Sequence, residues 1–199
     1  MLNKPKGLIT ARRDERHSTV MDLFPEEDRD VLFPVGRLDK DTEGLLIVTD
    51  DGAFTYNLLS PEGHVEKTYF FYAEGIPDKD KLEELSEGVS ICRNRTDKTA
   101  PAKIEITEHH ILKELVDFID YDTKTLLSRR GEMPAVGGFV TITEGKKHQV
   151  KRMVRYTGAR VVYLKRVKIG TVPLDETLPL GKYREMTPEE IECLKQKNA

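Results

Sequence analysis

The sequence has few of the residues and segments that mark secreted, membrane or metal-binding proteins. Its 199 residues include no tryptophan and two cysteines, Cys92 and Cys193, which lie about a hundred residues apart. Neither cysteine belongs to a C-x-x-C pair, so a disulfide framework or a zinc site is not expected. No apolar run approaches the ~18 residues of a membrane helix, and the N-terminus has no apolar core of signal-peptide length. We therefore expect a soluble, cytoplasmic protein with no membrane partner.

The histidines do not suggest a metal site. The chain has five of them, and none has the spacing of a metal motif such as H-E-x-x-H. His109 and His110 are adjacent, so on a regular element their side chains would point in different directions. The sequence therefore predicts no bound metal.

Charge of one sign is concentrated in one stretch, although the formal net charge is only −3. Between Gly145 and Leu174 the sequence has no Asp or Glu and nine basic residues, namely Lys146, Lys147, Lys151, Arg152, Arg155, Arg160, Lys165, Arg166 and Lys168. Acidic residues gather elsewhere, at 26–28, 50–51 and 78–87. A one-signed strip on a near-neutral protein indicates a polyanionic partner. The alternative is a solvated basic face.

The pattern of apolar residues predicts a mixture of strands and helices. Strands are expected at 2–10, 31–35, 45–48, 67–73, 102–107, 139–143 and 160–169. Helices are expected after Ser18-Thr19, over 54–59, 79–85 and 148–156, and from Thr187, where Glu190 completes a capping box. Residues 109–119 fit either a helix or a longer strand pair, and Pro134 and Gly137-Gly138 suggest a loop. Without a regular βαβ rhythm, we expect an α+β fold with a largely antiparallel sheet.

A polar loop between two expected strands is the first candidate for chemistry. It reads Gly36-Arg37-Leu38-Asp39-Lys40-Asp41-Thr42-Glu43-Gly44 and leads into the apolar run 45–48. A loop held between rigid strands is a common place for catalytic groups. Its three carboxylates would suit acid–base or glycosyl chemistry. Spacing alone favours a solvated surface turn, because short acidic loops are common.

Three further segments give this loop a family context. The loop resembles the active-site motif G-R-L-D-x-x-T-x-G-L-L of the pseudouridine synthases that modify ribosomal RNA at single sites. Residues 2–7 resemble that family's opening L-N-K-P-x-G, residues 66–69 its E-K-T-Y segment, and residues 144–153 its E-G-x-x-H-Q-V-K-R-M motif. The resemblance covers residues 1 to about 192 and is strongest to the RsuA-type, small-subunit (16S) branch. The joint occurrence of the motifs is far more specific than any one of them.

The resemblance implies a role for particular residues. Asp39 matches the catalytic nucleophile, Tyr69 the tyrosine that stacks on the target base and takes the C5 proton, and Lys151 the cation that pairs with the aspartate. Arg37 is expected to position the flipped nucleotide or its phosphate. Further RNA contacts are expected from residues on or beside the helix at 148–156, namely Lys147, His148, Gln149, Arg152 and Arg155.

The implied chemistry agrees with these residue types. The enzyme must break the N1–C1′ bond, turn the uracil and join C5 to C1′. A carboxylate can act as a nucleophile in such a step, and a nearby cation favours its ionised form. The nucleotide must leave the RNA stack at a cost of about a few kcal/mol, which phosphate contacts can offset. An isomerisation needs no cofactor or metal, and the expected partner is rRNA, namely 16S rRNA, free or in an assembling small subunit.

The fold implied by the resemblance is the pseudouridine synthase fold, a mixed, mainly antiparallel sheet in two subdomains with flanking helices and a central cleft. We interpret residues 1–199 as one catalytic domain without the S4-type RNA-binding domain with which the family usually begins, and residues 109–137 as an insertion. Alternatives are a synthase for large-subunit (23S) rRNA, an inactive RNA-binding assembly factor, or a glycoside-cleaving enzyme using Asp39 with Asp41 or Glu43. The intact set of Asp39, Tyr69 and Lys151 disfavours the inactive factor, and the lack of tryptophan disfavours the glycosidase.

Overall fold

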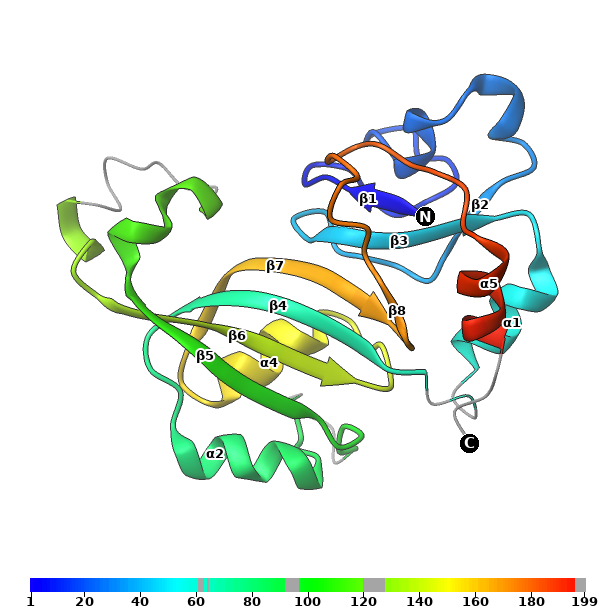
Figure 1. The fold of residues 1–199 in the computed structure, drawn as a ribbon. Coiled ribbons are helices and arrows are strands. Elements are labelled where there is room, and N and C mark those ends of the chain that lie inside the picture. The colour runs from blue at the N-terminus through cyan, green and yellow to red at the C-terminus, as the bar shows by residue number, and fades with distance from the viewer. Residues whose placement is uncertain (61–62, 64, 92–96, 120–127, 196–199) are drawn as a thin grey trace. The chain divides into compact units, whose positions relative to one another are not determined.

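The computed structural model describes residues 1–60, 63, 65–91, 97–119 and 128–195 (Figure 1). The chain divides into two compact units. Unit 1 combines Met1–Lys67 with Lys165–Ala199, and unit 2 is the intervening stretch Thr68–Leu164. None of the helices within the described ranges is both long and apolar enough to cross a bilayer.

The sheet of unit 1 is centred on β3 (Glu43–Thr49). β1 (Leu2–Lys4) and β2 (Phe33–Val35) pair with β3 in the antiparallel sense, whereas the part of β7 (Arg160–Ile169) that belongs to unit 1 pairs with it in parallel. β8 (Val172–Pro173) returns antiparallel to β7. Leu45 and Leu46 have no exposed surface although their side chains point to opposite faces. The apolar run at 45–48 is therefore a strand buried on both faces, as predicted.

Short helices cover this sheet, and their ends follow the expected capping rules. The 3₁₀ helices η1 (Val20–Leu23) and η2 (Glu26–Asp28) precede β2, and α1 (Gly52–Leu59) follows β3. α5 (Pro188–Lys195) begins at the predicted capping box, in which the main-chain N–H of Thr187 and of Glu190 each donate to the other residue's side chain. Phe54, Leu58 and Leu194 from these helices pack with Leu45 and Ile47 in one apolar cluster.

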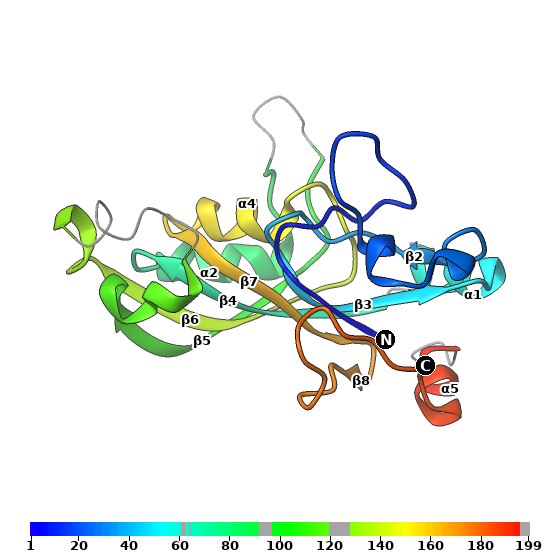
Figure 2. The same cartoon turned by 90° about the horizontal axis from the view of Figure 1, so that it is seen from above.

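In unit 2 the α-helices α2 (Lys79–Glu84) and α4 (Gln149–Tyr156) lie against one face of a sheet (Figures 1 and 2). Its strands lie in the order β7, β4 (Lys67–Glu74), β6 (Pro134–Ile142) and β5 (Lys103–Ile111). β5 and β6 are antiparallel, with a bulge between Ile106 and Glu108. Further helical segments are η4 (Leu85–Glu87) and η5 (Leu112–Phe118). The α+β class with a mainly antiparallel sheet is confirmed.

The main error of the sequence-based assignment lies at 134–138. We expected a loop because of Pro134 and the two glycines, but all of these residues belong to β6. Pro134 occupies the first position of the strand, where proline is tolerated. At Gly138 a Cβ atom would lie 2.2 Å from the carbonyl oxygen of Glu105, so the glycine permits a close approach of two strands. Of the expected insertion at 109–137, the described residues continue β5, form η5 and begin β6, and residues 120–127 lie outside the described ranges.

The close approach of β3 and β7 yields a stability prediction. Gly44 has φ of +100°, and a Cβ atom there would lie 2.2 Å from the carbonyl oxygen of Arg166. Gly7 has a similar φ of +89° but open space around it. We expect Gly44→Ala to lower the free energy of unfolding by about 3 kcal/mol or more, because main-chain strain and overpacking add. Gly7→Ala should cost only about 1–2 kcal/mol. Urea denaturation of both variants measures this, and equal losses would contradict the close-approach argument.

Candidate functional site

The loop between β2 and β3 carries Asp39, and its main chain is held at several points. The N–H of Thr42 donates to the carbonyl oxygen of Asp39 at 3.0 Å, closing a tight turn. The hydroxyl of Thr10 donates to the carbonyl oxygen of Leu38 at 2.8 Å and accepts from the N–H of Leu38 at 3.1 Å. Leu38 and Thr42 are buried, whereas Asp39 is only partly so. The turn therefore keeps its own backbone bonded inward and leaves Asp39 partly exposed.

A fully buried lysine organises this loop from below. Lys4 on β1 has no exposed surface. Its ammonium donates to the main-chain carbonyl oxygens of Pro5 at 2.9 Å, Asp39 at 3.2 Å and Thr42 at 2.9 Å. A buried cation is tolerated only when its donors are used in this way. Lys4 belongs to the opening L-N-K-P segment, which indicated only the family. The sequence did not predict that this lysine supports the Asp39 loop.

A second buried cation lies where β3 begins. Arg166 on β7 is 3% exposed, and its Nε donates to the carbonyl oxygen of Leu45 at 2.7 Å. Gly44, at the end of the Asp39 loop, pairs with Arg166 across the two parallel strands β3 and β7. Arg166 therefore lies next to the point where the loop enters β3. Burial, and secondly the positive charge of Arg166, lower the pKa of Lys67 to about 8. Unit 1 therefore concentrates buried positive charge around the start of β3.

The remaining predicted residues belong to unit 2. Tyr69 lies on β4 and is 8% exposed. Along β4, Tyr69, Phe71 and Ala73 are all buried and alternate with partly exposed residues. Because alternate residues of a strand share one face, Tyr69 belongs to the buried face of this strand.

Helix α4 separates an apolar face from a basic one. Val150, Met153 and Val154 are buried, at the i, i+3, i+4 spacing of one helix face. The predicted RNA contacts Lys147, His148 and Arg155 are exposed, and Lys151 and Arg152 are partly exposed. His148 adopts a left-handed conformation with φ of 52°, which is uncommon for a residue other than glycine. The helix is thus anchored by its apolar side and carries its cations on the other.

Gln149 differs from its basic neighbours because its side chain is used within the protein. It is 3% exposed, its Nε2 donates to Glu144 at 2.8 Å, and its Oε1 accepts from the N–H of Lys146 at 2.8 Å. Glu144 also accepts from the N–H of Ala100 at 3.0 Å. Gln149 therefore positions the turn that leads into α4. A contact between Gln149 and RNA stays a prediction.

The predicted site residues thus form two groups. Arg37 and Asp39 lie in unit 1, and Tyr69, Lys147, His148, Gln149, Lys151, Arg152 and Arg155 lie in unit 2. That the two groups meet in one pocket stays a prediction. Within the described residues, no cluster of three or more His, Cys, Asp or Glu side chains is arranged to hold a metal ion.

Comparison with known proteins assigns the chain to a family. Residues 1–156 match the sequence model of the RNA pseudouridylate synthase family. The chain belongs to this family. It is accordingly an isomerase that forms pseudouridine in RNA.

Individual relatives agree with the assignment. An uncharacterised RNA pseudouridine synthase of Bacillus subtilis is 42% identical over 200 residues, covering 100% of this chain and 74% of the relative. The ribosomal small subunit pseudouridine synthase A of Escherichia coli K12 is 37% identical, covering 96% of this chain and 71% of the relative. A crystal structure of a pseudouridylate synthase superposes with a TM-score of 0.77 at 34% identity, covering 97% and 71% of the two chains. This synthase therefore has the pseudouridine synthase fold.

Lys4 provides a test of how the Asp39 loop is held. Replacing Lys4 by Met should lower the free energy of unfolding by about 2–4 kcal/mol, because buried carbonyl oxygens of the loop lose their donor. Hydrogen exchange at the main-chain N–H of Thr42 should accelerate by more than the fall in the free energy of global unfolding accounts for. Urea denaturation and hydrogen exchange measure the two effects. Lys182→Met, at an exposed site of unit 1, should stay within about 0.5 kcal/mol. A Lys4→Met variant as stable as this control would show that the ammonium does not support the loop.

The pKa of Lys67 predicts a pH dependence of stability. The folded-state pKa of about 8 lies below the ordinary value of 10.5, so between these values the unfolded chain binds more protons than the folded one. Stability from this group therefore rises as the pH increases from about 8 to 10.5. Lys67→Met should lack this rise, and Lys67→Arg, which keeps its charge, should lack it too while remaining less stable than Lys67→Met. Unfolding free energies at pH 7, 8, 9 and 10 measure the difference, and parallel curves for all three proteins would contradict it.

Proposed function

We propose that this synthase isomerises a uridine of small-subunit (16S) ribosomal RNA, with Asp39 as its nucleophile. The observation that carries the proposal is the fixed loop at 36–44, whose backbone is bonded inward while Asp39 is partly exposed. The choice of RNA is supported by the ribosomal small subunit synthase of Escherichia coli, which is 37% identical. A cytoplasmic location is part of the same proposal.

Asp39 provides covalent catalysis. Its ionised carboxylate attacks the target nucleoside at C6 of the base or C1′ of the sugar, and the N1–C1′ bond breaks. The uracil turns so that C5 faces C1′, the C5–C1′ bond forms, C5 loses its proton and N1 gains one, and the carboxylate is released. No atoms are gained or lost overall. A nucleophile of this kind divides one difficult step into easier ones.

Two cations are candidates for stabilising the ionised carboxylate. The resemblance assigns this role to Lys151, on the basic face of α4 in unit 2. Arg166 belongs to the same unit as Asp39 and is buried where β3 begins. A guanidinium keeps its charge when buried, whereas an ammonium loses its proton more easily. We therefore propose Arg166 as a second cation that acts on the Asp39 loop.

Tyr69 and the basic face of α4 hold the substrate. The aromatic ring of Tyr69 stacks on the detached uracil, which must not diffuse away. The target nucleotide is flipped out of the RNA stack, and phosphate contacts by Lys147, His148, Arg152 and Arg155 offset that cost. Arg37, exposed just before Asp39, positions the flipped nucleotide.

The decisive experiment compares two carboxylates of one loop. Asp39→Asn should abolish pseudouridine formation on 16S rRNA, because an amide is not a nucleophile. Asp41→Asn, two residues away and exposed, should retain activity within a few-fold. Nucleoside mass spectrometry of rRNA from deletion cells complemented with each version measures both, and mapping the lost site identifies the subunit. Activity of Asp39→Asn would refute the nucleophile, and a lost site in 23S rRNA would refute the substrate.

Binding of RNA should depend on salt through α4. Changing Arg152 and Arg155 to Gln should weaken binding for all RNA sequences and reduce the slope of log K against log salt by about 0.7–0.9 per lost phosphate contact. Changing Lys79 and Lys182, exposed lysines outside the basic stretch, should leave the slope unchanged. Filter binding between 50 and 300 mM salt measures the slopes. Equal slopes for the wild type and the α4 variant would place the phosphate contacts elsewhere.

A further inference from the structure

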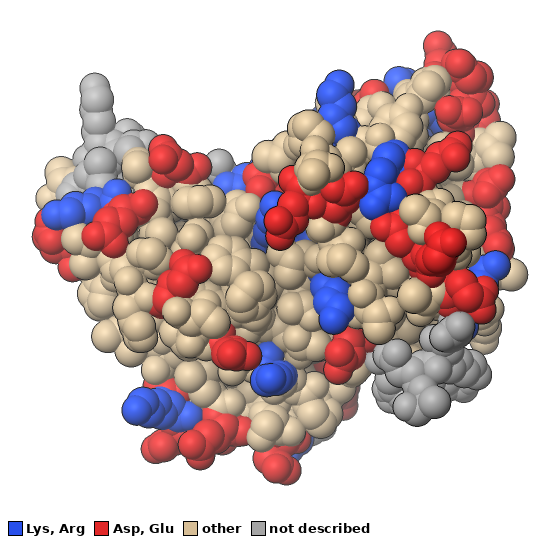
Figure 3. Space-filling model, viewed as in Figure 1, with Lys and Arg blue, Asp and Glu red and all other residues tan. Residues whose placement is uncertain are grey.

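Two acidic clusters of the sequence have no place in the proposed RNA contacts. They are Glu26-Glu27-Asp28, which forms η2, and Asp50-Asp51, which joins β3 to α1. Figure 3 shows acidic side chains gathered over the region of β2 and α1, at the right of the view. Phosphates are repelled from such a surface, so it calls for a different explanation.

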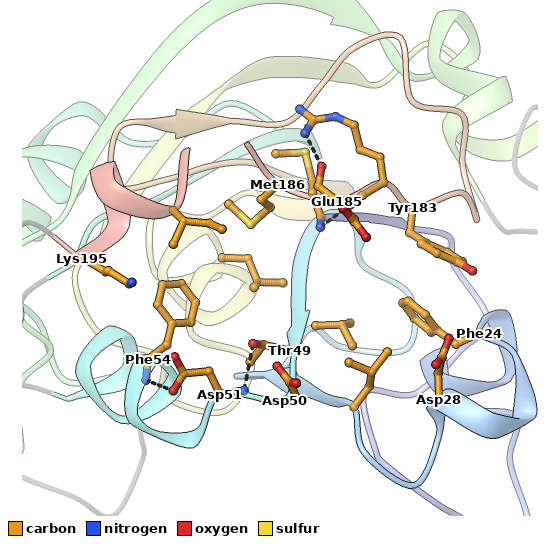
Figure 4. A pocket seen from close by; sticks show the side chains of 16 residues that line it. Phe24, Asp28, Thr49, Asp50, Asp51, Phe54, Tyr183, Glu185, Met186 and Lys195 are labelled. Carbon is orange, nitrogen blue, oxygen red and sulfur yellow. Dashed lines mark hydrogen bonds between the residues drawn. The ribbon is translucent and has the colours of Figure 1, made fainter. Parts of the chain in front are cut away.

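These clusters border a pocket within unit 1. The pocket has a volume of about 630 Å³ and is lined by the end of β3, by η2 and α1, and by residues 183–186 and α5. Ile47, Phe54 and Met186 contribute apolar surface to it, and the carboxylates of Asp28, Asp50, Asp51 and Glu185 belong to its lining as well (Figure 4). All four acidic residues are exposed. An apolar space therefore lies among carboxylates that come from three separate segments.

Few basic side chains of the described residues lie in the lining of this pocket. Arg184 lines the pocket, but its guanidinium binds Glu190 and Asp175, each at 2.7 Å. Lys195 is the other basic side chain in the lining. Among the described residues, the side chains of Asp28, Asp50 and Glu185 take part in no ion pair. The rim of the pocket, formed by Asp28, Asp50, Asp51 and Glu185, is consequently negative.

An aromatic pair adds a surface suited to cations. The rings of Phe24 and Tyr183 stack with centroids 4.3 Å apart, and Tyr183 is 43% exposed. Both residues line the pocket (Figure 4). The face of an exposed tyrosine attracts guanidinium and ammonium groups. Aromatic and electrostatic features therefore favour the same kind of ligand.

We propose that this pocket docks a basic polypeptide segment, in which an apolar anchor residue enters the pocket and flanking Arg or Lys side chains meet the acidic rim. One ammonium group could reach only part of a rim formed by three segments, whereas a chain with several cations can reach all of it. Charge complementarity of this kind gives specificity and fast association. RNA is disfavoured as the occupant because its phosphates carry the same sign as the rim.

The pocket is separate from the catalytic loop in unit 1. The loop with Asp39 precedes the first residue of β3, and Asp50 and Asp51 follow its last residue. A seven-residue strand spans about 20 Å at ~3.3 Å per residue. A polypeptide can therefore occupy the pocket without contacting Asp39, and the docking proposal does not rest on the proposed nucleophile.

The test uses the full chain and a synthetic peptide with two Arg on each side of a central Leu-Phe pair. Fluorescence anisotropy of the labelled peptide measures its affinity. The pocket variant Asp28→Asn/Asp50→Asn/Glu185→Gln should weaken binding about tenfold, since exposed charge pairs are individually weak but add. Asp51 is left unchanged because its carboxylate caps α1 through the N–H of Phe54 at 2.8 Å.

The control variant Glu15→Gln/Glu176→Gln/Glu192→Gln changes the net charge equally at exposed sites of unit 1 that neither line the pocket nor belong to the two acidic clusters. It should bind the peptide within twofold of the wild type. A second peptide with Ser in place of Leu-Phe should bind at least tenfold more weakly than the first. Pseudouridine formation on naked RNA should be the same in the pocket variant and the wild type.

Each opposite result would overturn the proposal. Equal weakening in the pocket and control variants would mean that the peptide follows net charge only. Undiminished binding of the Ser peptide would mean that no apolar anchor enters the pocket. A shift of the pocket variant from dimer to monomer in sedimentation would assign the surface to a second copy of this chain. Competition by RNA at the pocket would assign it to nucleic acid.

Discussion

The candidate site depends on the hydrogen bonds that the buried ammonium of Lys4 donates to the main chain of the loop at 39–42. A carboxylate nucleophile has to be held in place by its backbone, because its own oxygens must remain available to the substrate. In this synthase the carbonyl oxygens of Asp39 and Thr42 bind one buried cation, and Thr10 holds Leu38 from a different segment. The loop is therefore fixed through its main chain by Lys4 and Thr10, while Asp39 itself is partly exposed.

Positive charge serves different purposes in the two units. Lys4 and Arg166 are buried and donate to main-chain carbonyl oxygens, so their charge shapes the protein. The cations of α4 lie on the face opposite to Val150, Met153 and Val154, where solvent and a polyanion can reach them. Negative charge is likewise concentrated, around an apolar pocket in unit 1. A near-neutral chain thus presents surfaces of opposite sign, and net charge alone says little about its partners.

Local patterns predicted most of the fold, whereas contacts between distant residues could not be predicted. The apolar run at 45–48, the helix at 148–156 and the capping box at Thr187 are local signals, and each was interpreted correctly. Pro134 and Gly138 were misassigned because their role depends on β5, about thirty residues earlier in the chain. Lys4 and Arg166 were missed as site residues for the same reason, since their bonds reach residues 38 and 121 positions away. The motifs located Asp39, Tyr69 and Lys151, but the way in which Asp39 is supported emerged only from the structure.

The two ends of the chain are interleaved in unit 1, and this has a consequence for biosynthesis. The N–H of Gly181 donates to the carbonyl oxygen of Asn3 at 2.8 Å, and the N–H of Asn3 donates to the carbonyl oxygen of Lys182 at 3.0 Å. The segment around residue 182 therefore lies beside β1. Unit 2 is one continuous stretch and can fold as soon as it emerges from the ribosome, since domains generally fold as units during synthesis. Unit 1 must wait until residues beyond 182 have been translated. The loop at 36–44 belongs to unit 1, so it is consequently among the last parts of the nascent chain to reach its final packing.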